Sequence, residues 1–241
     1  MKKMFFFSLF AFLGQISFSA RAQDLGPVID MSVIVNNAGL QSVEMAERKR
    51  AGMPDKYSGK STAKTRSANF SYVPNEALRK KTVNNYVAKL KRYNPAVATT
   101  VAQNFAPGKF DYSDLYQQAN KSSGLKENDA ADVLAVYIIL NWMIVNNVKD
   151  GNAITVPMAR GVPTQTASIM ANNQKLSTPG MAAQIGEQLK LNTIILQTGW
   201  IQSIKDKTDE TYRQKIAANF KSLYHFDIGQ MKLTDKGLGK K

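Results

Sequence analysis

The sequence of 241 residues contains no cysteine and only one histidine, His225. Without cysteine the chain can form no disulfide, thiolate metal site, cysteine nucleophile or lipid anchor on an N-terminal cysteine. A single histidine excludes zinc sites built from several histidines, and no G-x-S-x-G turn presents a serine for a catalytic triad. We interpret His225 as a structural or capping residue. We therefore expect no metal and no cofactor, and we expect burial of apolar side chains to stabilise the fold.

Nucleotide-binding motifs are also missing, since neither a P-loop nor a G-x-G-x-x-G sequence occurs. Two S-x-x-K matches, at Ser61–Lys64 and Ser123–Lys126, lack both the S-D-N and the K-T-G motifs that accompany such a serine in enzymes. We interpret them as chance matches in a lysine-rich chain. The sequence thus carries no signature of an enzyme class.

Long hydrophobic runs are missing as well, because a bilayer-spanning helix needs about 20 apolar residues. The apolar run Met4–Phe18 is shorter and contains polar residues. Two lysines precede it and Ala20-Arg21-Ala22 follows, which is the pattern of a cleaved secretory signal peptide. We predict a signal peptide over residues 1–22, secretion to the periplasm, a mature chain that begins at Gln23, and no transmembrane segment.

Acidic residues are scarce, because 18 Asp and Glu stand against 32 Lys and Arg, a formal net charge of +14. The imbalance is greatest between Glu44 and Arg92, where 13 Lys and Arg stand against four acids. Gly, Pro, Ser, Thr and Lys dominate residues 51–69, a composition typical of a mobile linker. We predict a poorly ordered basic segment over residues 23–69 and an anionic partner for this third of the chain.

After Pro74, apolar residues recur at helical spacing, and helix start signals stand where they are needed. The pattern predicts helices over Asn75–Arg92, Pro179–Asp206 and Asp209–Tyr224. The segment Glu127–Asn147 is apolar on every side from Val133 to Val145, so it belongs in the middle of a core. The sequence therefore predicts an all-α fold, a compact multi-helix domain over residues 70–241 around a central buried helix at about 127–147.

Arg79 interrupts the pattern of the first of these helices, because it lies on the same face as Tyr86 and Leu90. Its guanidinium could reach water along the apolar face. Alternatively, it could form a buried ion pair. The second interpretation names Asp129 and Asp132, at the start of the central helix, as the partners.

The acids Glu127, Asp129 and Asp132 themselves have two interpretations. With Asn128 as the N-cap, Asp129 and Asp132 would face the positive end of the helix dipole, which stabilises the helix without any chemistry. Two carboxylates roughly 5–9 Å apart, one of them with a raised pKa, would instead form a site for glycoside hydrolysis. The spacing of the acids permits both.

Five cations on the outer side of the helix predicted over Asn75–Arg92 are candidate contacts for an anionic surface: Lys80, Lys81, Lys89, Lys91 and Arg92. Tyrosines among the cations of this region would also suit single-stranded nucleic acid or an anionic glycan. Secreted proteins rarely meet nucleic acid, so we expect a protein or an anionic envelope component as the partner and not nucleic acid. The simpler interpretation is a solvated surface.

Three stretches, "YVPNEALRKKTVNNYV", "GLKENDAADVLAVYIILNW" and "DIGQMKLTDKGL", occur in this order with helical segments between them. In this arrangement the chain resembles an uncharacterised family of secreted bacterial proteins that is catalogued only as a domain of unknown function. The resemblance covers about Tyr72 to Leu238. It implies a bacterial, exported, mostly helical domain and carries over no activity and no functional residues.

The sequence as a whole favours an exported, periplasmic or envelope protein with a non-catalytic binding role, such as that of an inhibitor or immunity-type module. The alternative is a hydrolase of cell-wall glycan or peptide that uses the acids at the start of the central helix. A closed helix end would favour the binding protein, and a cleft that joins these acids to a further carboxylate would favour the hydrolase. No feature of the sequence predicts an oligomeric state.

Overall fold

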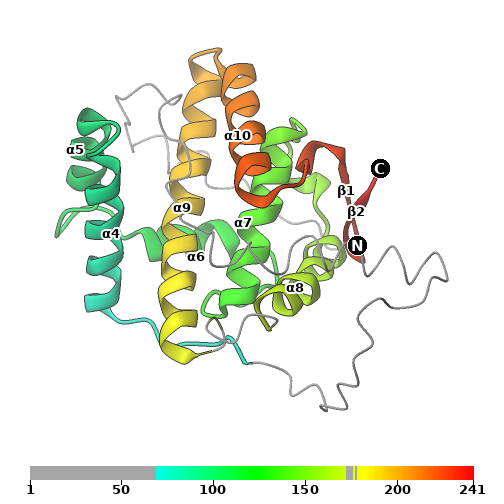
Figure 1. The fold of residues 1–241 in the computed structure, drawn as a ribbon, viewed down its shortest axis with the longest axis horizontal. Coiled ribbons are helices and arrows are strands. Elements are labelled where there is room, and N and C mark those ends of the chain that lie inside the picture. Colours follow the sequence, from blue (N-terminus) through cyan, green and yellow to red (C-terminus); the bar gives the residue numbers. More distant parts are fainter. Residues whose placement is uncertain (1–68, 172–175, 177) are drawn as a thin grey trace.

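The computed structural model describes residues 69–171, 176 and 178–241. The predicted signal peptide, residues 1–22, and nearly all of the predicted basic segment, residues 23–69, lie outside the described residues. Within them the chain is mostly helical, with one small two-stranded sheet at its end (Figure 1). The predicted all-α class is confirmed. No helix in the described ranges has both the length and the apolar character needed to cross a membrane.

The helices follow one another with short connections. They are α4 (Glu76–Leu90), α5 (Pro95–Asn104), α6 (Tyr112–Asn120), α7 (Ala130–Val145), α8 (Val156–Ala171), α9 (Pro179–Lys205) and α10 (Asp209–Tyr224). Two 3₁₀ turns, η2 (Gly151–Ala153) and η3 (Ile228–Gln230), precede α8 and the sheet. The sheet pairs β1 (Met231–Thr234) with β2 (Gly237–Lys240) in antiparallel register, with Met231 opposite Lys240.

Helix starts agree with the capping signals in the sequence. Asn75 accepts a hydrogen bond from the Leu78 backbone N–H at 2.8 Å, and Asn94 accepts one from the Val97 N–H at 3.1 Å. These side chains satisfy backbone donors that the first helical turn leaves unpaired. His225 ends α10 with a left-handed backbone, φ 56°, so its predicted capping role is confirmed.

The central helix begins three residues later than predicted, at Ala130, and its N-cap is Asp129 instead of Asn128. The reason is a short β-bridge between Ser71 and Asp129. The Tyr72 N–H donates to the Asn128 carbonyl at 2.9 Å, and the Ala130 N–H donates to the Phe70 carbonyl at 3.0 Å. Because this bridge uses the backbone around Asn128, the helix can start only after it.

Two helices, not one, form the centre of the domain. Helix α7 is buried on every side, as predicted. Every residue of α9 from Leu189 to Ile201 is buried too, although the helical spacing of apolar residues in Pro179–Asp206 predicts an apolar stripe on only one face of the helix. Polar α9 side chains in this stretch bond to the helix's own backbone: Asn192 donates to the Gln188 carbonyl, and Thr193 to the Leu189 carbonyl, both at 2.8 Å. These bonds remove most of the cost of burying the polar groups.

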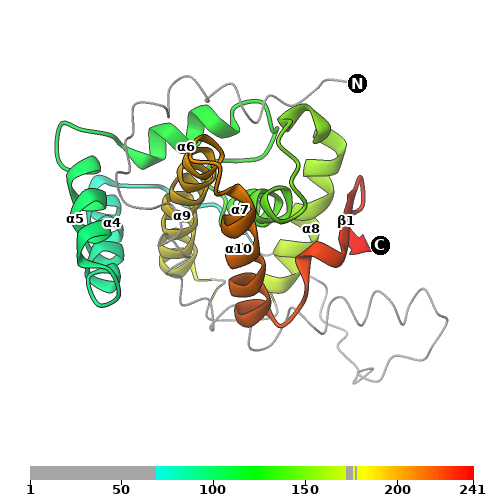
Figure 2. The ribbon, with the colours of Figure 1, turned by 90° about the horizontal axis from the view of Figure 1, so that it is seen from above.

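The other elements surround this pair. Helices α4, α6, α7 and α10 pack against α9, and α8 packs against the opposite side of α7 (Figures 1 and 2). The β1–β2 hairpin covers α8, where Gln165 donates to the Leu238 carbonyl and accepts from the Leu238 N–H, each at 2.9 Å. Helix α4 therefore lies on the outer face of α9, and the surface between these two helices contains a groove.

Candidate functional site: a basic groove above a buried ion pair

A groove of about 290 Å³ lies between α4 and α9. Its lining residues are Leu78, Lys81, Thr82, Asn85, Tyr86, Ala88, Lys89, Arg92, Gln184 and Gln188. The α4 residues recur at intervals of three or four, so they form one stripe along the helix. Residues Gln184 and Gln188 are one turn apart on α9 and complete the other wall. The lining contains three cations and three amide side chains but no carboxylate, a set of groups suited to an anion.

The groove sorts the five predicted cations into two groups. Lys81, Lys89 and Arg92 line it, whereas Lys80 on α4 and Lys91, the C-cap of α4, are exposed and outside the lining. At a rise of 1.5 Å per residue, the Cα atoms of Lys81 and Lys89 are about 12 Å apart along the axis of α4, and Arg92 lies in the turn that follows the helix. The cations are thus distributed along the groove, which suits an extended ligand with more than one negative group.

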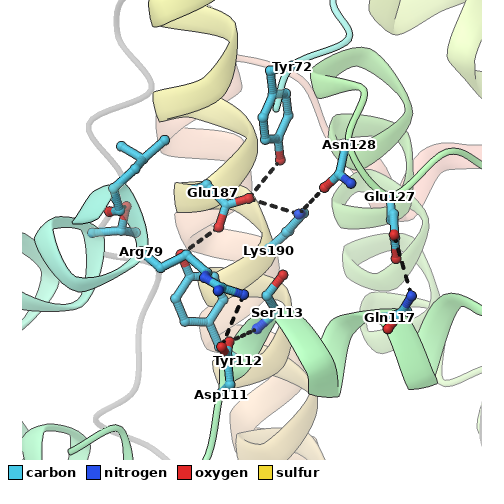
Figure 3. Close-up of polar contacts among 12 residues, drawn as sticks. Tyr72, Arg79, Asp111, Tyr112, Ser113, Gln117, Glu127, Asn128, Glu187 and Lys190 are labelled. Atoms are coloured by element: carbon cyan, nitrogen blue, oxygen red, sulfur yellow. Dashed lines mark hydrogen bonds and ion pairs between the residues drawn. The ribbon is translucent and has the colours of Figure 1, made fainter. Parts of the chain in front are cut away.

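Beneath this wall, on the same stretch of α9, Glu187 and Lys190 form a fully buried ion pair. Their side chains are 0% and 1% exposed, and Lys190 Nζ lies 2.8 Å from Glu187 Oε1 (Figure 3). Helical spacing of three residues brings them together. Isolated charges at such depth would be strongly destabilising, so their remaining hydrogen-bonding capacity must be satisfied nearby.

Two tyrosine hydroxyls satisfy the carboxylate. Tyr72 donates to Glu187 Oε1 at 3.0 Å, and Tyr112 donates to Glu187 Oε2 at 2.7 Å (Figure 3). Tyr72 comes from the segment before α4, and Tyr112 from the first turn of α6. Burial, followed by the nearby Glu187 charge, raises the pKa of both phenols well above the usual value, so both remain hydrogen-bond donors.

The ammonium group of Lys190 has a second partner in Asn128, whose Oδ1 lies 2.7 Å from Nζ. The aromatic rings of Tyr72 and Tyr116 lie 5.3 and 5.9 Å from Nζ, within the range of cation–π attraction. Side chains from the segment before α4, from α6 and from the segment before α7 thus meet the pair of charges on α9. The network fixes the rotation of α9, and with it the direction in which Gln184 and Gln188 face α4.

No family model, curated protein or solved structure matches this chain. The resemblance to a family of secreted bacterial proteins stays a prediction.

The structure corrects the predicted partner of Arg79. Arg79 Nη1 lies 3.1 Å from Asp111 Oδ2, with the two side chains 30% and 36% exposed (Figure 3). Asp111 caps α6 by accepting from the Ser113 N–H at 2.7 Å. Arg79 is therefore paired with neither Asp129 nor Asp132. The sequence pattern placed Arg79 on the correct face of α4, but the start of α6, and not the start of α7, occupies that side.

Each predicted acid has a structural partner. Asp129 caps α7 by accepting from the Ala131 N–H at 3.1 Å, and it also accepts from Ser71 Oγ at 2.9 Å. Asp132 accepts from the Lys126 N–H at 2.7 Å. Glu127 accepts from Gln117 at 3.4 Å. None of the three acids lines the α4–α9 groove or the small cavity beside Asn120.

Burial raises the pKa of Asp132, and the neighbouring Asp129 charge adds to the effect, while the hydrogen bond from the Lys126 N–H opposes it. A raised carboxyl pKa is one requirement of a general acid, but a cleft that admits a substrate is another. In the described part of the chain, no three His, Asp or Glu side chains gather as metal ligands.

Sequence reasoning missed Glu187, Lys190, Tyr72 and Tyr112. In the helix predicted over Pro179–Asp206, Glu187 and Lys190 fall outside the apolar stripe and looked like part of a solvated face. One signal could have drawn attention to them: the sequence from Leu189 to Ile201 has few charges for an exposed helix face. That signal indicates deep burial on both sides, but it does not name the partners.

Proposed function

We propose that this protein is an exported, periplasmic or envelope binding protein whose α4–α9 groove takes a negatively charged ligand. The observation that carries the proposal is the joint placement of Lys81, Lys89 and Arg92 with three amides and no acid in one groove. A concave surface with charges spread along it suits an extended polymer. The amides can hydrogen-bond to hydroxyl groups between its charges.

The export part of the proposal rests on the sequence of residues 1–22. It is tested by intact-mass measurement of the protein recovered from its native compartment. A chain that begins at Gln23 supports export, and a chain that retains Met1 contradicts it.

The groove itself is tested with a carboxylated polysaccharide, polygalacturonate, and with neutral dextran as the reference polymer. Isothermal titration should detect binding of the anionic polymer at low salt, weaker binding at high salt, and no binding of dextran. In the variant Lys81→Gln/Lys89→Gln the affinity should fall about tenfold or more, equivalent to about 1.4 kcal/mol.

The matched control is Lys80→Gln/Lys91→Gln, which removes the same charge from α4 and its C-cap but leaves the groove lining intact. Its affinity should change much less than that of the groove variant. Equal losses in the two variants would show that net charge alone attracts the polymer. In that case the groove would have no special role.

The hydrolase alternative has less support, because Glu127, Asp129 and Asp132 each hold a structural contact and none lines the groove. These contacts favour the binding role over catalysis. An assay for release of reducing ends from cell-wall glycan, with Asp132→Asn as the reference, tests the alternative directly.

A further inference from the structure

The buried ion pair of Glu187 and Lys190 has a third polar side chain beside it, the amide of Asn128. Lys190 Nζ lies 2.7 Å from the side-chain amide oxygen of Asn128 and 2.8 Å from Glu187 Oε1. A primary amine, a carboxamide and a carboxyl group therefore meet at one point. These are the three groups needed to join a lysine to an asparagine by an amide bond.

We propose that Lys190 and Asn128 form an intramolecular amide crosslink, with Glu187 as the catalytic residue. Nζ attacks Cγ of Asn128, a new C–N bond forms, and the bond from Cγ to Nδ2 breaks. The amide nitrogen leaves as ammonia, so no oxidant, reductant or other reactant is consumed. Lys190 starts as an ammonium group and loses two protons: Glu187 accepts the first and passes it to the leaving nitrogen, and then accepts the second, which departs with the ammonia as ammonium.

The geometry places the reacting atoms close together. Asn128 Cγ is one C=O bond, about 1.2 Å, from Oδ1, so it lies within about 3.9 Å of Nζ. Reacting atoms held about 3–3.5 Å apart in a fixed orientation gain a large rate advantage over free groups. The Tyr72 N–H bond to the Asn128 carbonyl, 2.9 Å long, holds the Asn128 backbone in place.

Attack requires the uncharged amine, so Lys190 must first pass a proton to Glu187, whose Oε1 lies 2.8 Å from Nζ. The rings of Tyr72 and Tyr116 enclose Nζ on two sides. The hydroxyls of Tyr72 and Tyr112 hold the carboxyl group of Glu187 in position. Asn128 is only partly buried, which leaves ammonia a way out.

The crosslink would tie the start of α7 to the middle of α9, two positions 62 residues apart in the chain. A covalent loop of this kind restricts the unfolded chain, as a disulfide does. The sequence contains no cysteine and cannot use a disulfide for this purpose. The amide bond would therefore stabilise this fold covalently, as disulfides do in many secreted proteins.

Mass spectrometry of the full-length folded chain tests the proposal. The intact mass should be lower than the sequence mass by one ammonia. Trypsin should fail to cut after Lys190, and digestion under denaturing conditions should release peptide 127–149 covalently joined to peptide 176–205. An unmodified intact mass together with cleavage after Lys190 would overturn the proposal. So would an ammonia loss confined to peptide 127–149, which would indicate a succinimide at Asn128.

Three variants and one control separate the chemistry from folding. Glu187→Gln keeps a polar partner for both tyrosines and should slow crosslinking by about 100-fold or more, with the helical circular dichroism spectrum retained. Asn128→Ala should show the unmodified mass. Asn128→Asp should lose water in place of ammonia, so its joined product should have the same mass as that of the native chain. Lys149→Gln, at an exposed ion pair, is the control and should crosslink normally. Full crosslinking in folded Glu187→Gln would show that Glu187 takes no part in the reaction.

Discussion

Gly186 lies directly against the ring of Tyr72, so closely that a Cβ atom at position 186 would overlap the ring. Because Gly186 has no side chain, the Tyr72 ring can pack against α9, where its hydroxyl group reaches Glu187. The sequence does not reveal this contact, because Tyr72 lies 115 residues before Glu187, the neighbour of Gly186 in α9.

Replacing Gly186 by alanine should therefore destabilise the fold by about 1–3 kcal/mol, because the Tyr72 ring must move and the hydrogen bond to Glu187 is strained. The control is Gly180→Ala in the same helix, where no neighbouring atom lies within 4 Å of the added Cβ. That change should be neutral or stabilise by up to about 1 kcal/mol. Urea midpoints measure both, and equal effects would contradict the contact.

The tyrosine hydroxyls that bind Glu187 should each contribute to stability. Tyr72→Phe and Tyr112→Phe keep the rings and remove one donor to a buried carboxylate, so each should cost about 1.5–3 kcal/mol. Tyr93→Phe is the control, because Tyr93 is 80% exposed and should show no effect. Urea denaturation provides the comparison, provided that the unfolding free energy depends on urea concentration with the same slope in every variant. No loss in either buried variant would show that the hydroxyls are dispensable to the network.

The ion pair of Arg79 with Asp111 should be weak. Both side chains are about a third exposed, so a double-mutant cycle with alanine should give a coupling below about 1 kcal/mol. Asp111→Ala alone should cost more than Arg79→Ala alone, because it also removes the N-cap of α6. A larger coupling of Arg79 with Asp129 than with Asp111 would contradict the arrangement described here.

Asp132 should give stability a pH dependence of its own. Its pKa in the folded protein is raised from 3.8, chiefly by burial, so the folded state binds its proton more tightly than the unfolded state. The resulting stabilisation is complete below the unfolded pKa and is lost as pH rises through the folded pKa. The native chain should therefore lose stability as pH rises through this window, whereas Asp132→Asn has no carboxyl proton to lose and should not. Relative to the native chain, the variant should be more stable above the window than below it. Urea midpoints across the acid range measure the difference, and a difference that does not change with pH would refute it.

The sequence predicted those parts of the fold whose signals are local. The start of α10 follows from Thr208 and the two acids after it, and the predicted span Asp209–Tyr224 matches the structure. The all-round apolar character of α7 indicated a central helix, and the structure confirms it. In each case the deciding residues are neighbours in the chain.

Features that depend on distant partners could not be predicted in the same way. The β-bridge of Ser71 with Asp129 moves the start of α7, and nothing within residues 124–132 announces it. The hairpin of β1 and β2 consists of strands of only four residues and depends on α8 for its apolar partner surface. One wall of the candidate groove could be predicted in part, because three of the five cations named from the sequence line it. Gln184 and Gln188 become its opposite wall only when α9 packs beside α4.

Helix α7 is held at its two ends by segments from opposite ends of the described chain. The Ser71 bridge fixes its start, and near its end Trp142 Nε1 donates to the Met231 carbonyl at 2.8 Å. During synthesis α7 therefore leaves the ribosome well before α9 and the hairpin that cover it. Its apolar surface stays open to wrong contacts until almost the whole chain has emerged, so α7 is the segment that a chaperone would have to shield.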